Sequence, residues 1–135
     1  KMSKLLNLSL STIAEPTLYL ENSEVRLRVR SADTLVSENT GSTMIKLILD
    51  DPADKNRFPV YHNIVLPKQD SKPESRDIML QNLKRAMIAF GVPGDFDGLF
   101  DLAKIEGKEF WAKIGIEEYQ GLERNVIKKF INPAL

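Results

Sequence analysis

Three stretches in the first half of the chain alternate between apolar and polar residues, as β-strands with one buried face do. They span residues 17–30, 44–49 and 58–66, and polar loops separate them. In the first stretch the apolar side chains fall on one face and three basic side chains on the other. These basic residues are Arg26, Arg28 and Arg30. We therefore expect three short strands, the first with an arginine stripe along its outer face.

The second half of the chain begins with a helical stretch and ends with two more strands. Apolar residues in 77–90 recur with the spacing of an amphipathic helix, and a glycine and a proline follow them. Residues 95–102 are expected to add one helical turn. Alternation returns at residues 109–117 and 124–131, which a polar turn joins. The predicted order is therefore three strands, a helix and two strands.

This order predicts a mainly β protein with the oligonucleotide-binding (OB) fold, a five-stranded barrel with one helix between strands three and four. The main alternative is a small sandwich of helix and sheet. Residues 1–16 are expected to form an N-terminal arm, because polar residues interrupt their apolar ones and Pro16 stops any helix. Residues 17–135 are expected to form the OB-fold domain.

The chain carries no net charge, because 19 basic residues balance 19 acidic ones. Binding of nucleic acid through bulk charge is disfavoured, so any such site must come from local segregation of charge. No apolar run is long enough to span a bilayer, and the one in residues 4–14 is too short and interrupted for a signal peptide. The absence of cysteine fits a reducing compartment, so we expect the cytoplasm and no membrane.

No motif in the sequence points to an enzyme, a metal or a cofactor. His62 is the only histidine, which excludes a multi-histidine metal centre, and we expect it to be hydrogen-bonded inside the barrel. Asp50, Asp51 and Asp54 lack the spacing of a calcium loop. No glycine-rich phosphate loop or nucleophile elbow is present. We expect a binding protein without catalytic residues.

Aromatic rings beside basic residues give the most direct indication of a ligand. Trp111, the only tryptophan, alternates with Phe110 and Ala112 and is expected to face outward beside Lys113. Exposed rings stack on unpaired bases while Lys and Arg neutralise phosphates, so the pattern suits single-stranded nucleic acid. The candidate binding residues are Arg26, Arg28, Arg30, Lys46, Tyr61, Trp111, Lys113, Tyr119, Arg124 and Lys128.

Each candidate also has a simpler interpretation. The arginines would pair with nearby acids on a solvated strand face, and the arm or a second copy of the chain would cover Trp111. Tyr119, which we place in the turn between the last two strands, would pack on its own hairpin. Because Lys128 and Lys129 are consecutive in a strand, they point to opposite faces and at most one joins a given groove.

Short motifs in residues 80–131 carry a resemblance to a known family. They are a helix that ends in Gly-Val, a Gly-Lys before an apolar strand, and an Asn-x-Ile-Lys-Lys-aromatic segment after a turn. The matching residues are Leu83, Gly91, Val92, Gly107, Lys108, Lys113, Tyr119, Asn125, Val126, Ile127, Lys128, Lys129 and Phe130. The segment resembles phage-encoded single-stranded DNA-binding proteins. The resemblance implies an OB-type barrel that protects single strands during phage DNA replication or recombination.

We therefore predict a protein that binds single-stranded DNA with little sequence preference, in the host cytoplasm and alongside replication or recombination proteins. The alternative is a non-enzymatic interaction or structural module. Such a module would self-associate, for example as a homodimer, through its barrel face and N-terminal arm.

Overall fold

The computed structural model describes residues 4–92 and 101–132. Over these residues the predicted order of three strands, a helix and two strands is confirmed. The helical turn expected at residues 95–102 falls almost wholly outside the described residues. The elements are β1 (Glu24–Val36), β2 (Thr43–Asp50), β3 (Val60–Val65), α1 (Pro73–Ala89), the short 3-10 helix η1 (Leu102–Lys104), β4 (Glu109–Tyr119) and β5 (Leu122–Ile131).

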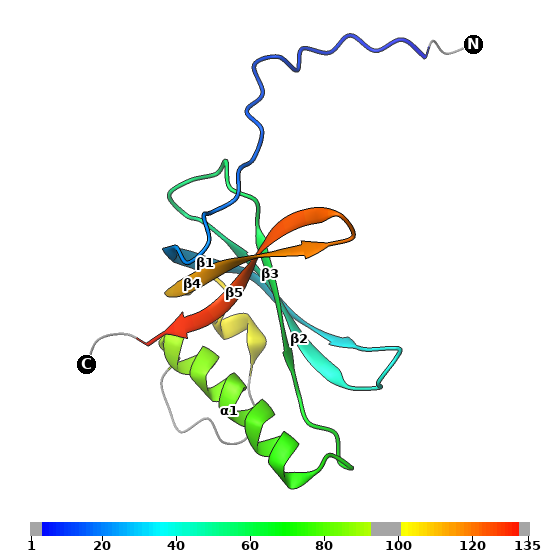
Figure 1. Cartoon of the computed structure of the whole chain (residues 1–135), viewed down its shortest axis with the longest axis vertical. Coiled ribbons are helices and arrows are strands. Elements are labelled where there is room, and N and C mark those ends of the chain that lie inside the picture. Colours follow the sequence, from blue (N-terminus) through cyan, green and yellow to red (C-terminus); the bar gives the residue numbers. More distant parts are fainter. Residues whose placement is uncertain (1–3, 93–100, 133–135) are drawn as a thin grey trace.

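The five strands form one antiparallel sheet in the order β3-β2-β1-β4-β5 (Figure 1). β1 is central, and its two ends pair with different neighbours: residues 28–36 with β2 and residues 24–28 with β4. The sheet curves until His62 on β3 meets Phe130 on β5, with ring centroids 5.3 Å apart. Among the described residues no hydrogen-bonded ladder joins β3 to β5. The fold is thus mainly β, and the sheet is not closed.

The hydrophobic core lies on the inner face of this curved sheet, and α1 covers one end of it (Figure 1). Leu27, Leu47 and Phe110 are buried there, each between more exposed neighbours, as the alternation predicted. Phe90, which follows α1, packs edge-on against Phe110 and Phe130 at centroid distances of 4.9 and 5.7 Å. This aromatic cluster joins the helix to β4 and β5.

Two β-bulges interrupt the alternation. In β1 the register with β2 shifts between Val29 and Ser31, which leaves Arg30 as the extra residue. In the β4–β5 pair it shifts between Lys113 and Ile114, and here Lys128 is the extra residue. A bulge adds an unpaired residue and redirects the side chains that follow it. Both extra residues are among the predicted binding residues.

The first strand begins at Glu24 rather than at residue 17, because Thr17–Ser23 has other partners. The main-chain N–H of Tyr19 donates to Oδ1 of Asn125 (2.8 Å), and Nδ2 of Asn125 donates to the carbonyls of Tyr19 (3.0 Å) and Gly115 (3.2 Å). The N–H of Thr17 donates to the carbonyl of Asn56 (2.8 Å). The segment is therefore fixed by a buried side chain and a loop.

The other boundary errors have local causes. The first strand continues to Val36, where a loop was expected, because this half of β1 pairs with β2 as a projecting hairpin. The helix begins at Pro73 rather than residue 77, since proline is compatible with the first turn of a helix. The third strand is shorter than the predicted 58–66.

The chain before Thr17 extends away from the sheet (Figure 1). Its apolar side chains are exposed, namely Leu5, Leu6, Leu8, Leu10 and Ile13. None of the helices within the described ranges combines the length and apolarity needed to cross a bilayer.

Candidate nucleic-acid interface

Trp111 lies on the outer face of the sheet, as predicted, and its side chain is half-exposed. Its relative exposure is 51%, whereas Phe110 and Ala112 on either side are buried. Arg26 on β1 is its direct cross-strand partner on one side and Ile131 on β5 on the other. Directly opposed residues in antiparallel strands share a face, so a guanidinium and an aliphatic side chain flank the indole.

Two lysines continue this surface along β4 and β5. Lys113 is two residues from Trp111 on the same strand, and Lys129 is its cross-strand partner. Neither lysine has an ion-pair partner within residues 4–92 and 101–132. We call Arg26, Trp111, Lys113, Lys129 and Ile131 the outer patch. Lys129 and Ile131 were absent from the sequence-based set, because the bulge at Lys128 decides which lysine faces this way.

Arg26 is held by a weak surface ion pair. Its Nη2 lies 3.2 Å from Oε2 of Glu109, and both side chains are substantially exposed. Exposed ion pairs contribute about 0–1 kcal/mol, because water and salt screen them. A phosphate can therefore replace Glu109 at little cost.

Arg28 forms a stronger ion pair than Arg26 does. Its Nε and Nη2 donate to the two carboxylate oxygens of Asp50 at 3.1 and 2.9 Å, and this hydrogen-bonded pair raises the pKa of Arg28. Two parallel bonds to one carboxylate form a strong, geometrically defined pair. Arg30 lies at the bulge. The three arginines of the predicted stripe are therefore not equivalent, because Asp50 neutralises Arg28 and Arg30 is the extra residue of the bulge.

Lys46 and Tyr61 lie on a different part of the outer face. Tyr61 is exposed on β3 opposite Ile48, and Lys46 on β2 stands between Asp33 and Asn63. β2 and β1 stand between β3 and β4 in the sheet, so Tyr61 and Trp111 are not cross-strand neighbours.

Tyr119 and Arg124 form a pair at the end of the β4–β5 hairpin. Tyr119 is the last residue of β4 rather than a turn residue, and the Arg124 guanidinium lies 4.6 Å from the centre of its ring. Arg124 Nη2 also lies 3.6 Å from Oε1 of Glu117. Eight residues along β4, about 26 Å, separate Tyr119 from Trp111. Tyr119 thus packs on its own hairpin, away from the outer patch.

Lys128 is directed toward the segment that precedes β1. Its Nζ lies 2.7 Å from Oε1 of Glu21 and 3.0 Å from Oδ1 of Asn22, and this contact lowers the pKa of Glu21. Gly115 leaves room for the lysine stem, because a Cβ there would lie 2.8 Å from Cγ of Lys128. Lys128 therefore joins β5 to the segment before β1 and is not part of the outer patch.

His62 faces inward, and its ring meets Phe130 edge-on. Burial lowers the pKa of His62, so the imidazole is neutral near pH 7. The described residues give its ring no hydrogen bond, so the expected hydrogen bond stays a prediction. The same residues contain no cluster of three metal-binding side chains of the His, Cys, Asp and Glu types.

Comparison of the sequence with protein-family models and with curated proteins finds no match. The resemblance to phage single-stranded DNA-binding proteins therefore stays a prediction, and the functional argument depends on the geometry of the outer patch.

Proposed function

We propose that this protein binds single-stranded DNA with little sequence preference on an OB-type barrel. The connectivity supports a partly open, five-stranded Greek-key barrel, because β1 pairs with both β2 and β4 while the edge strands β3 and β5 meet through His62 and Phe130. The helix between β3 and β4 covers one end, as that architecture requires.

The exposed indole of Trp111 between positive charges carries the proposal. Arg26 stands beside it, and Lys113 follows on the same strand. A base can stack on this ring only when it is unpaired, whereas the adjacent cations suit any phosphate backbone. This combination favours single strands over duplex, and stacking together with phosphate contacts does not depend on base identity.

The biological role comes from the sequence resemblance alone. If residues 80–131 share the function of the phage proteins they resemble, the chain protects single strands during phage DNA replication or recombination in the host cytoplasm. Replication or recombination proteins would then be its partners.

Oligothymidylate is expected to quench the fluorescence of Trp111, and the Trp111→Ala variant should lose about 1–3 kcal/mol of binding free energy, since one stacked base contributes that much. Because Trp111 is the only tryptophan, the fluorescence reports a single position. Anisotropy of a labelled oligonucleotide measures the affinity of the variant.

Trp111→Phe is the matched control, because it keeps an aromatic face and should lose less affinity. Duplex DNA should quench weakly. If Trp111→Ala binds with wild-type affinity while remaining folded, the outer patch is not the site.

Replacing Lys113 by Gln should make the slope of log affinity against log salt less negative by about 0.7, the value for one phosphate contact on a single strand. Lys55→Gln is the matched control: it removes the same charge from an exposed position in the loop before β3. Affinities measured at several salt concentrations give both slopes. Equal slopes for the two variants would remove Lys113 from the interface.

Self-association remains the second candidate, because the exposed leucines of the arm favour it. Sedimentation of the DNA-free protein separates the two: an apolar assembly persists at high salt, whereas DNA binding weakens there.

A further inference from the structure

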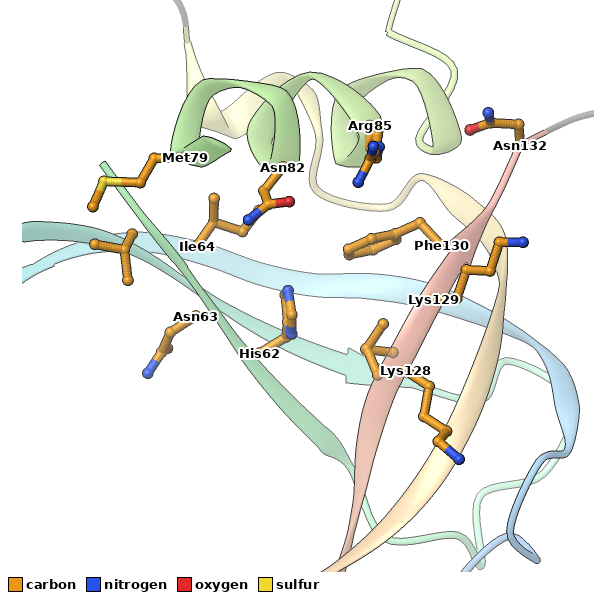
Figure 2. Close-up of a pocket in the computed structure, with 12 residues that line it drawn as sticks. His62, Asn63, Ile64, Met79, Asn82, Arg85, Lys128, Lys129, Phe130 and Asn132 are labelled. Atoms are coloured by element: carbon orange, nitrogen blue, oxygen red, sulfur yellow. The ribbon is translucent and has the colours of Figure 1, made fainter. Parts of the chain in front are cut away.

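A cleft opens where the sheet is not closed, between β3, β5 and α1 (Figure 2). Its volume is about 730 Å³. Met79, Asn82 and Arg85 line it from the helix, and Ile64 and Phe130 line it from the two strands. β3 and β5 are the edges of the sheet, so their outward main-chain groups have no strand partner there. The cleft therefore combines an apolar wall with free main-chain donors and acceptors.

The charge of the cleft is positive. Arg85 and Lys129 are cations on its wall, Asn63, Asn82 and Asn132 are amides, and no acidic residue is among the described residues that line it. Within the described part of the chain, neither cation has a carboxylate within ion-pair distance. Figure 2 shows Arg85 and Asn82 pointing from α1 toward Phe130, whereas the amines of Lys128 and Lys129 and the amide of Asn63 turn away from it.

A second hollow in the molecule differs from the cleft in the charge of the residues that line it. That hollow is lined by Arg28, Arg30, Lys55 and Arg57, but also by Asp50, Asp51 and Asp54. Two of its arginines are in ion pairs, Arg28 with Asp50 and Arg57 with Asp54. Three acidic residues thus offset most of the charge of its four basic ones, whereas no acidic residue is among the described residues that line the cleft. An anion is therefore the ligand that the cleft favours.

The remaining lining groups suit a nucleobase. Phe130 presents part of its ring to the cleft, and such a ring packs against the plane or edge of a base. Asn82 offers an amide that both donates and accepts, which is what the edge of a base requires. His62 also lines the cleft and is neutral, so it adds no charge and can donate or accept one hydrogen bond.

We propose that this cleft binds a nucleotide, with its phosphate on Arg85 and its base against Phe130 and the Asn82 amide. The ligand is either a free nucleotide or the phosphorylated end of a DNA strand, which share this chemistry. The site lies on the inner side of the β3–β5 gap, and of the described residues that line the cleft only Lys129 also belongs to the outer patch.

Titration of the ¹⁵N-labelled protein with dTMP, followed by NMR, tests the proposal. We expect saturable shifts at Asn82, Arg85 and Phe130, and Arg85→Gln should weaken dTMP binding by about tenfold or more, as loss of a charge-assisted hydrogen bond does. Lys84→Gln is the matched control, because it removes the neighbouring exposed charge outside the cleft and should leave the affinity unchanged. Arg85 is exposed, so its variant should keep the fold, and thermal melting checks this.

Three outcomes would overturn the proposal: no saturable shifts in the wild type, wild-type affinity in Arg85→Gln, or thymidine binding as tightly as dTMP. Displacement of dTMP by oligothymidylate with and without a 5′-phosphate separates the two sources. Displacement by the 5′-phosphorylated oligonucleotide alone identifies the strand end, and failure of both oligonucleotides to displace dTMP identifies the free nucleotide. Trp111→Ala should leave the dTMP shifts unchanged. The proposal for the cleft and the proposal for the outer patch can therefore be refuted independently.

Discussion

Replacing Phe90 by alanine is expected to lower the free energy of unfolding by about 3–5 kcal/mol, the usual cost of removing a large aromatic side chain from a core. Phe90 is 2% exposed and packs against both Phe110 and Phe130. Its loss leaves a cavity where α1 meets the sheet, because three elements converge there. Urea denaturation followed by circular dichroism measures the change.

Phe58 provides a matched control for this prediction. It has the same side chain but is 46% exposed, so Phe58→Ala should cost about 1 kcal/mol or less. If the two variants lost the same stability, Phe90 would not be the contact that holds the helix on the sheet. Because Phe130 also lines the nucleotide cleft, Phe90→Ala should perturb that site as well.

Replacing Asn125 by alanine is expected to cost about 2–4 kcal/mol, because it leaves buried main-chain groups of Tyr19 without partners. Asn125 is 5% exposed, and its side chain makes hydrogen bonds to Tyr19 and Gly115. The segment around Tyr19 should loosen, while the main-chain bonds of Asn22 and Ser23 to Ile114 keep its last residues on β4. Amide hydrogen exchange measures this directly, because the N–H of Tyr19 donates to the side chain that is removed.

Asn56→Ala is the control for Asn125→Ala. Asn56 is exposed, and its main-chain carbonyl, which the substitution keeps, accepts the bond from Thr17. This variant should retain wild-type stability and slow exchange at Tyr19. Unchanged exchange at Tyr19 in Asn125→Ala would show that the asparagine does not hold the segment.

The spacing of apolar and polar residues was enough to predict the order of strands and helix and the exposure of Trp111. Alternation depends on neighbours within a strand, so Phe110 and Ala112 sufficed to turn Trp111 outward. The same reasoning failed at Thr17–Ser23, because Tyr19 is fixed by Asn125, which lies 106 residues away in sequence. The alternation of apolar and polar residues also could not predict whether the sheet closes, because closure depends on how the edge strands β3 and β5 meet.

The candidate site was predicted less well, for physical reasons of the same kind. Bulges arise from the pairing of two strands, so nothing within β5 itself indicates that Lys128 points to Glu21 and leaves Lys129 beside Lys113. The Arg28–Asp50 pair depends on the β1–β2 register. The distance between Tyr61 and Trp111 depends on the order of strands in the sheet.

The contact between Arg26 and Glu109 also affects how DNA binding would respond to salt. Glu109 acts as a counterion that is part of the protein, since its carboxylate already sits 3.2 Å from the guanidinium. A phosphate that displaces it releases a tethered carboxylate rather than a dissolved ion, and only dissolved ions contribute to the salt slope. The slope would then count fewer phosphates than the protein touches.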